Sequence, residues 1–270
     1  MTESKIETIK ITSIYLNKIM PVSVYLPCDY NEKDSFPTLY FLHGRSGDEN
    51  ILIESGLNIS ADKLIGNREI NSMIIVCPRI ENSRGINSSS ICKEVNDPLG
   101  RIINIGMYED YLINEVIPTI DKNFKTIKNR KGRYIGGASA GGYVALHSAF
   151  RHSDLFSKTG GHMPAIELQL EEEDKLYFQN PGDWDKYNPI YIASNMERSD
   201  IKIYLDAGDK DEGEFYKGCS ALHEILTEKG MNSQNYIFKG NHNIKYIKSN
   251  IEKYLRFYAN KIKSQSQHSR

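Results

Sequence analysis

The segment 137–141, Gly-Ala-Ser-Ala-Gly, places one serine between small residues. A strand-like run at 134–136 precedes it and a helix-like run at 143–146 follows it. A strand–turn–helix of this kind holds a serine in a strained backbone conformation with its hydroxyl exposed, and the glycines give the backbone room to double back. Ser139 is therefore the predicted nucleophile, in the turn called a nucleophile elbow.

A serine hydroxyl is a poor nucleophile at neutral pH and needs a general base. His242 follows the last strand-like run and precedes the last helical pattern. Loops in this position gather at the carboxyl ends of the strands in an open α/β sheet, so His242 is the predicted base. Among the other histidines, His162 is a candidate to line the pocket, and His43 is expected to be a hydrogen-bonded turn residue.

The base needs a carboxylate that fixes its tautomer and stabilises its protonated form. The loop after the strand-like run 201–205 lies between the serine and the histidine in the chain, which is the order serine, acid, histidine found in hydrolases that have a nucleophile elbow. Its candidates are Asp206, Asp209, Asp211, Glu212 and Glu214. Asp206 stands against the strand end, where a capping or turn role is expected. We favour Asp211, with Asp209 as its main competitor.

Acyl transfer also needs donors for the oxyanion that forms on the carbonyl. One is the backbone amide of Ala140, which follows the nucleophile. The segment 41–47 reads as a strand followed by a His-Gly turn whose glycines let amides face a ligand. We nominate the Arg45 amide as the second donor. The Arg45 side chain could in addition favour an acidic group on the substrate.

Alternating apolar residues near the N-terminus, at 9–11 and 22–26, predict antiparallel strands. Short continuous apolar runs predict strands buried on both faces, as in a parallel sheet. These runs are 38–42, 73–77, 134–138, 201–205 and 236–238.

Helical patterns alternate with these runs, at 108–124, 142–151, 215–229 and 245–262. Pro118 predicts a kink or a break in the first of them. The alternation predicts an α/β fold with a mostly parallel central sheet and helices on both faces. We expect one domain over 1–270, with 167–200 as an insertion near the active site.

The chain has 270 residues and a formal net charge of −1, which gives no basic surplus for binding nucleic acid. No apolar run is long enough to predict a membrane span, and the first residues do not resemble a secretory signal. The cysteines, Cys28, Cys77, Cys92 and Cys219, lie far apart and match no metal-site spacing. We therefore expect reduced thiols in a cytoplasmic protein.

Taken together, these motifs resemble the putative-esterase family of α/β-hydrolases, which includes esterase D (S-formylglutathione hydrolase), feruloyl esterases and enterochelin esterase. The resemblance covers most of the chain, roughly 22–258. It is carried by the segments 24–27, 36–44, 73–78, 108–112, 136–143, 208–211 and 240–243. It implies an α/β-hydrolase fold and a Ser–His–Asp triad of Ser139, His242 and Asp211, which favours Asp211 over Asp209. The segment 167–200 matches nothing in the family pattern and is expected to set substrate choice.

The sequence thus predicts a serine carboxylesterase that hydrolyses a small-molecule ester or thioester through an acyl-enzyme. This chemistry requires no metal or organic cofactor, and no nucleic acid or membrane is an expected partner. A homodimer is compatible with the sequence, which does not itself determine the oligomeric state. An acyltransferase using the same triad is the first alternative, and a non-catalytic binding protein on the same fold is the second.

Overall fold

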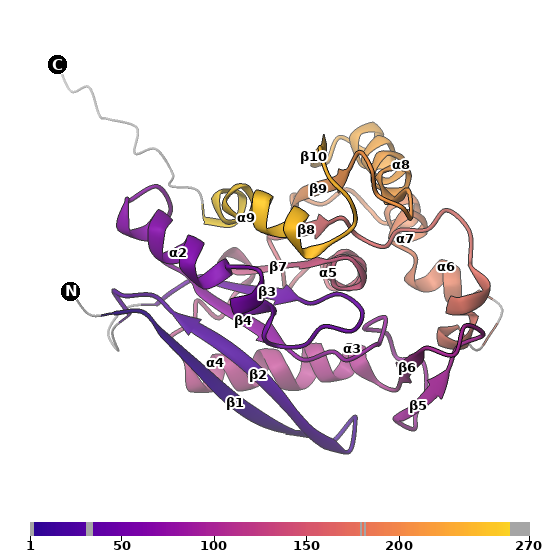
Figure 1. Ribbon diagram of the computed structural model, residues 1–270, viewed down its shortest axis with the longest axis horizontal. Helices are drawn as coiled ribbons and strands as arrows, with labels where there is room; N and C mark the ends of the chain where they lie inside the picture. Colours follow the sequence, from indigo (N-terminus) through magenta and orange to yellow (C-terminus); the bar gives the residue numbers. More distant parts are fainter. Residues whose placement is uncertain (1–2, 31–34, 179, 181, 260–270) are drawn as a thin grey trace.

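The computed structural model describes residues 3–30, 35–178, 180 and 182–259, and it has the α/β architecture predicted from the sequence (Figure 1). Its strands are β1 (Lys5–Ser13), β2 (Lys18–Leu26), β3 (Thr38–Leu42), β4 (Ile74–Pro78), β5 (Lys93–Asn96), β6 (Ile102–Ile105), β7 (Arg133–Ala138), β8 (Lys158–His162), β9 (Lys202–Gly208) and β10 (Asn232–Phe238). Its α-helices are α1 (Ile51–Glu54), α2 (Leu57–Gly66), α3 (Tyr108–Asp110), α4 (Ile117–Asn123), α5 (Ala140–Arg151), α6 (Asp183–Tyr187), α7 (Pro189–Asn195), α8 (Phe215–Glu228) and α9 (Ile244–Ala259).

Eight of the described strands form one sheet in the order β1-β2-β4-β3-β7-β8-β9-β10. The pairs β1–β2 and β2–β4 are antiparallel, and the remaining neighbours are parallel. The nucleophile strand β7 therefore lies in the middle of the sheet. Its carboxyl end is at the same edge as those of β3, β8 and β9, so the loops that carry the predicted site residues meet there.

Most of the apolar runs are buried on both faces, as predicted: every residue of β3, β4 and β7 is buried. The expectation is wrong for the run 236–238. It belongs to β10, an edge strand whose residues are exposed or half-buried, because only β9 pairs with it. The short apolar run at the end of this strand packs along one neighbour instead of filling the core.

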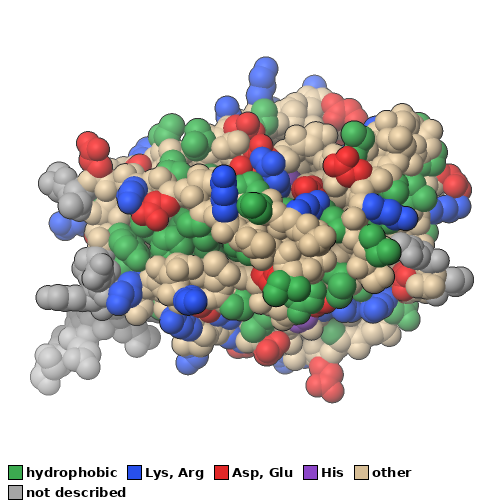
Figure 2. All heavy atoms as spheres, turned by 90° about the horizontal axis from the view of Figure 1, so that it is seen from below, with side chains coloured by type: hydrophobic (Ala, Val, Ile, Leu, Met, Phe, Trp, Pro, Cys, Tyr) green, Lys and Arg blue, Asp and Glu red, His purple; other side chains and the backbone are tan. Residues whose placement is uncertain are grey.

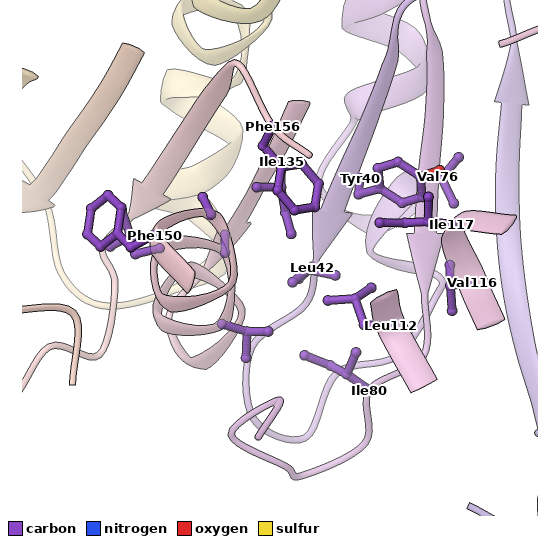
Figure 3. Packing of buried hydrophobic residues seen from close by; sticks show 14 of the residues in the cluster. Tyr40, Leu42, Val76, Ile80, Leu112, Val116, Ile117, Ile135, Phe150 and Phe156 are labelled. Carbon is purple, nitrogen blue, oxygen red and sulfur yellow. The ribbon is translucent and has the colours of Figure 1, made fainter. Parts of the chain in front are cut away.

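Helices cover both faces of the sheet (Figure 1). On one face α2 and α9 pack over a core that includes Leu39, Ile75 and Tyr254. On the other face α4, α5 and α8 pack over a second core. Figure 3 shows part of this second core, in which Leu42 of the sheet lies near Leu112 and Ile135 lies beside Phe156 of the loop before β8.

The helical pattern 108–124 forms contiguous helical residues over 108–123, so the chain does not break at Pro118; only its hydrogen-bonding pattern changes before the proline. Residues Tyr111–Val116 form a π-helical segment between α3 and α4. Pro118 is the second residue of α4, which follows the π-helical segment directly, and it has no N–H to donate to the preceding turn. The widened turns before it accommodate the proline ring without ending the helix.

The segment 167–200 contains the 3₁₀ helix Glu172–Tyr177 followed by α6 and α7. Its Tyr177, Phe178 and Tyr187 pack on Ile103 and Ile105 of the β5–β6 hairpin in a third, smaller apolar cluster. Segment and hairpin together cover one end of the molecule (Figure 1).

Basic and acidic side chains are mixed over the face drawn in Figure 2, which shows no continuous surface of one sign. No helix in the described part of the chain combines the length and the apolar character that a membrane crossing requires.

Candidate active site

Ser139 occupies a strained turn between β7 and α5. Its backbone has φ 55° and ψ −120°, a conformation that residues with side chains rarely adopt. Three backbone hydrogen bonds hold it there: the Ser139 amide donates to the carbonyl of His162 at 3.0 Å, and its own carbonyl accepts from the amides of Tyr143 and Ala165. The sequence motif at 137–141 thus forms the tight turn that its residue types predicted.

Two glycines of this motif are required by close backbone approach. A Cβ on Gly141 would lie 2.3 Å from the carbonyl oxygen of Leu42, and one on Gly137 would lie 2.5 Å from the backbone of Gly141. Real Cβ atoms do not come this close to backbone, so the turn exists only because both positions lack a side chain.

The predicted base and acid contact the serine and each other in one chain of hydrogen bonds. The Nε2 atom of His242 lies 2.8 Å from the Oγ atom of Ser139, and the Nδ1 atom of His242 lies 2.8 Å from Oδ2 of Asp211. A carboxylate only accepts hydrogen bonds, so Nδ1 carries the proton and Nε2 accepts from the serine hydroxyl. The edge of the Phe215 ring packs against the imidazole with a centroid separation of 5.2 Å.

The carboxylates of the 205–213 loop have separate partners. The Asp211 side chain is completely buried, and its second oxygen accepts the Gly213 amide at 2.9 Å. Asp209 does not contact His242; its carboxylate accepts the Gly240 amide at 2.9 Å and so ties the loop to the end of β10. Glu212 accepts the backbone amide of His242 at 3.1 Å.

Asp206 lies inside the protein and not in a turn, which corrects the capping role expected for it. It is a fully buried residue of β9 whose carboxylate accepts from the hydroxyls of Tyr246 at 2.7 Å and Tyr254 at 2.8 Å. Its other oxygen lies 2.9 Å from Nδ1 of His162. The prediction that His162 is a candidate to line the pocket is wrong, because this ring is fully buried and stacks on Tyr254.

This buried polar cluster of His162, Asp206, Tyr246, Tyr254 and Tyr258 was not found from the sequence. Gly136 and Gly160, neighbours in register on β7 and β8, make room for it, since a Cβ on either would lie about 2 Å from the Tyr258 hydroxyl. The paired Gly-Gly sequences at 136–137 and 160–161 were the available signal for a side chain packed closely against the sheet.

The turn at 43–47 lies directly beside Ser139. A Cβ on Gly44 would lie 3.1 Å from the Cβ of Ser139. The His43 ring is buried and accepts the Ile80 amide at 2.9 Å through Nε2, while Nδ1 donates to the Gly44 carbonyl at 2.8 Å. This is the hydrogen-bonded turn role predicted for His43. Among the described residues, no hydrogen-bond acceptor is found for the backbone amides of Arg45 and Ala140.

The Arg45 side chain has acidic partners within the protein, so it does not stand ready for an acidic substrate group. Its guanidinium lies 3.2 Å from Asp174 and 3.9 Å from Glu173, both in the segment 167–200. The structure thereby links this segment to the turn beside Ser139.

A cavity of about 600 Å³ opens beside Ser139 and His242. Its walls are mainly apolar and include Ile51, Met163 and Ile247, and the turn at 43–47 forms one side of it. Trp184, Tyr187 and Tyr191, three aromatic residues of the segment 167–200, do not line this cavity. Trp184 and Tyr187 belong to the apolar cluster on the β5–β6 hairpin.

The fold and this chain of contacts define an α/β-hydrolase in which a serine at a nucleophile elbow is hydrogen-bonded to a histidine and, through it, to an aspartate. The chain belongs to the family described as "Putative esterase", whose model matches residues 13–258. The predicted family resemblance is confirmed.

Among curated proteins, the chain is similar to an endo-1,4-beta-xylanase/feruloyl esterase of Xylanibacter ruminicola, with 28% identity over 237 residues. The match covers 84% of this chain but only 30% of that relative, so the chain spans less than a third of the relative's length.

Two solved structures show the same fold. One is a ferulic acid esterase, with a TM-score of 0.78, 22% identity and coverage of 95% of this chain and 98% of the other. The second is an S-formylglutathione hydrolase from Agrobacterium tumefaciens, with a TM-score of 0.75, 16% identity and coverage of 96% and 95%.

Proposed function

We propose that this protein is a serine carboxylesterase that hydrolyses a small-molecule acyl ester or thioester through an acyl-enzyme. The observation that carries the proposal is the continuous hydrogen-bonded path from Asp211 through His242 to the Ser139 hydroxyl. A serine, a histidine and a buried carboxylate in this order are the groups that nucleophilic acyl transfer needs.

In the proposed reaction, His242 takes the proton of Ser139 through Nε2 as the Oγ atom attacks the ester carbonyl. The negative charge that develops on the carbonyl oxygen is met by the amides of Arg45 and Ala140, which have no other hydrogen-bond acceptor among the described residues. Buried Asp211 stabilises protonated His242, which then donates its proton to the leaving alcohol or thiol. Water, activated by the same histidine, releases the acid and restores the serine.

The cavity supports an apolar acyl or aryl group on the substrate, because Ile51, Met163 and Ile247 form its walls. The feruloyl esterase named among the relatives has a substrate with an aryl acid, which is consistent with such a cavity. We therefore include an aryl ester among the substrates to be tested. The cytoplasmic location expected from the cysteines stays a prediction.

The test is hydrolysis of p-nitrophenyl acetate, butyrate and octanoate and of methyl ferulate by wild type and by Ser139→Ala. Loss of the nucleophile lowers kcat by a factor on the order of 10⁶ when the three groups act as a unit. Ser220→Ala, an exposed serine on α8, is the matched control and keeps wild-type rates. Turnover by Ser139→Ala at the wild-type rate would contradict the proposal.

The same acyl-enzyme could be passed to an alcohol instead of water. Adding alcohol acceptors to the assay and measuring the ratio of ester formed to acid released separates the esterase from an acyltransferase. We expect hydrolysis to dominate, because the cavity leaves Ser139 and His242 in contact with solvent-accessible space.

A further inference from the structure

Asp174 is a buried carboxylate placed between two arginines. It lies on the 3₁₀ helix Glu172–Tyr177 of the segment 167–200, and its side chain is completely buried. Its Oδ1 atom is 3.2 Å from the guanidinium of Arg45, and its Oδ2 atom pairs with the guanidinium of Arg84. A buried carboxylate of this kind is costly unless its charge is matched, so both arginines are needed where they are.

The second arginine anchors this pair in the core. Arg84 is 3% exposed, donates to Glu167 at 2.8 Å and lies over the ring of Tyr143, which is in the first turns of the helix that follows Ser139. Burial, and after it the neighbouring Arg84 cation, lower the pKa of Arg45. Among the described residues, Asp174 is the carboxylate that pairs with both arginines.

The Arg45 side chain leaves from the turn that faces the nucleophile. Within that turn, the His43 ring fixes the start and the Asn82 side chain accepts the Ser46 amide at 2.7 Å. Ser46 has a positive φ of 62°, so the backbone reverses immediately after Arg45. Within the described residues, the Arg45 guanidinium forms ion pairs with Asp174 and Glu173 of the segment 167–200.

We propose that Asp174 is a positioning residue, which holds the Arg45 side chain and thereby fixes the Arg45 amide next to Ser139. The segment 167–200 would then set the geometry of the oxyanion site as well as cover one end of the molecule. This inference rests on the proposed function, because it requires the Arg45 amide to bind the oxyanion.

The test compares Asp174→Asn and Arg45→Met with wild type. Asp174→Asn keeps the shape of the side chain and removes its charge, and Arg45→Met keeps the backbone amide but removes the group that Asp174 holds. Each is assayed on a p-nitrophenyl ester and on the matching thionoester, in which sulfur replaces the carbonyl oxygen. Glu172→Gln is the control, because Glu172 lies on the same helix but its side chain is 79% exposed.

We expect both variants to lower kcat on the oxygen ester by about tenfold or more, with little change in KM, because an oxyanion donor acts in the transition state and a lost donor costs roughly 10²–10³. The rate ratio of oxygen ester to thionoester should fall in the same variants, since sulfur already fits the oxyanion site poorly. A purely structural defect lowers both rates together and leaves this ratio unchanged. The double variant should be no slower than the slower single variant.

Variants that melt like wild type and keep the wild-type ratio of oxygen-ester to thionoester rates, whether or not kcat falls, would overturn the inference. If Asp174→Asn does not fold, Arg45→Met decides the question alone, because Asp174 keeps Arg84 as a partner in that variant. Failure of the proposed function looks different: wild type itself would hydrolyse none of the esters and would not be labelled by a fluorophosphonate. That outcome would overturn both proposals.

Discussion

The carbonyl of His162 accepts the Ser139 amide at 3.0 Å, while the ring of His162 lies 2.9 Å from the carboxylate of Asp206. One residue of β8 thus touches the strained turn with its backbone and the buried polar cluster with its side chain. The same aspartate accepts the Tyr246 hydroxyl, and Tyr246 stands in the first turn of α9, four residues after His242. The cluster therefore supports both the nucleophile turn and the start of the helix that follows the base.

Removing the acceptor at the centre of this cluster should destabilise the protein strongly. Asp206→Ala leaves the Tyr246 and Tyr254 hydroxyls and the His162 ring without their shared partner, and we expect a loss of roughly 3–5 kcal/mol. Urea denaturation monitored by circular dichroism measures it. Asp185→Ala, an exposed position on α6, serves as the control and should unfold at the wild-type midpoint. An Asp206→Ala midpoint equal to wild type would show that the cluster contributes nothing to stability.

The two aspartates that compete in the sequence should separate clearly in kinetics. Asp211→Asn removes the carboxylate that contacts Nδ1 of His242, and we expect kcat to fall by about 10⁴ because the imidazole loses its orienting acceptor. Asp209→Asn disturbs only a hydrogen bond to the Gly240 amide, and we expect a change of less than about tenfold. Steady-state assays of the two variants side by side decide between them. A larger loss of kcat in Asp209→Asn than in Asp211→Asn would show that Asp209, and not Asp211, is the acid.

Replacement of glycine by alanine should have opposite effects on stability at Gly141, in the turn that holds Ser139, and at Gly66, at the end of α2. Gly141→Ala would place a Cβ 2.3 Å from the Leu42 carbonyl oxygen, so we expect a protein that does not reach the native turn. Gly66→Ala, at the end of α2, meets no atom within 4 Å, and we expect it to be neutral or to stabilise by up to about 1 kcal/mol. Thermal melting and fluorophosphonate labelling report both outcomes. A Gly141→Ala protein with full labelling would show that the turn relaxes without cost.

Stability should decrease as the pH falls from neutrality, in part because of His147. Burial lowers the pKa of His147 from its usual 6.5 to about 4. Between these values the unfolded chain binds a proton that the folded protein does not, so stability is lost progressively as the pH drops from 6.5 to 4. The total loss from this residue is about 3 kcal/mol.

Urea midpoints measured at several pH values between 7.5 and 4.5 test this effect. His147→Gln should flatten the pH dependence, although burial also lowers the pKa of His43, so part of the slope remains. Ser220→Ala, an exposed position on α8 that carries no titratable group, is the control and should keep the wild-type slope. An unchanged slope in His147→Gln would contradict the prediction.

The elements that surround Ser139 were predictable because their signals are local. Small residues in a tight turn, an apolar strand before it and a helical period after it all lie within about twenty consecutive positions. The same locality explains the error at 236–238. An apolar run indicates a strand, but its place at the edge or in the middle of the sheet depends on which strands pair with it.

The sequence by itself therefore determined the fold class, the nucleophile turn and the loops in which a base and an acid were expected. Only the tertiary structure decided which aspartate contacts His242, that Asp206 is buried against Tyr246 and Tyr254 of α9, and which carboxylate holds Arg45. These choices depend on side chains that meet across 31 to 129 positions of the chain. Spacing along a sequence carries no information about such distances, because the register of the sheet and the packing of its helices set them.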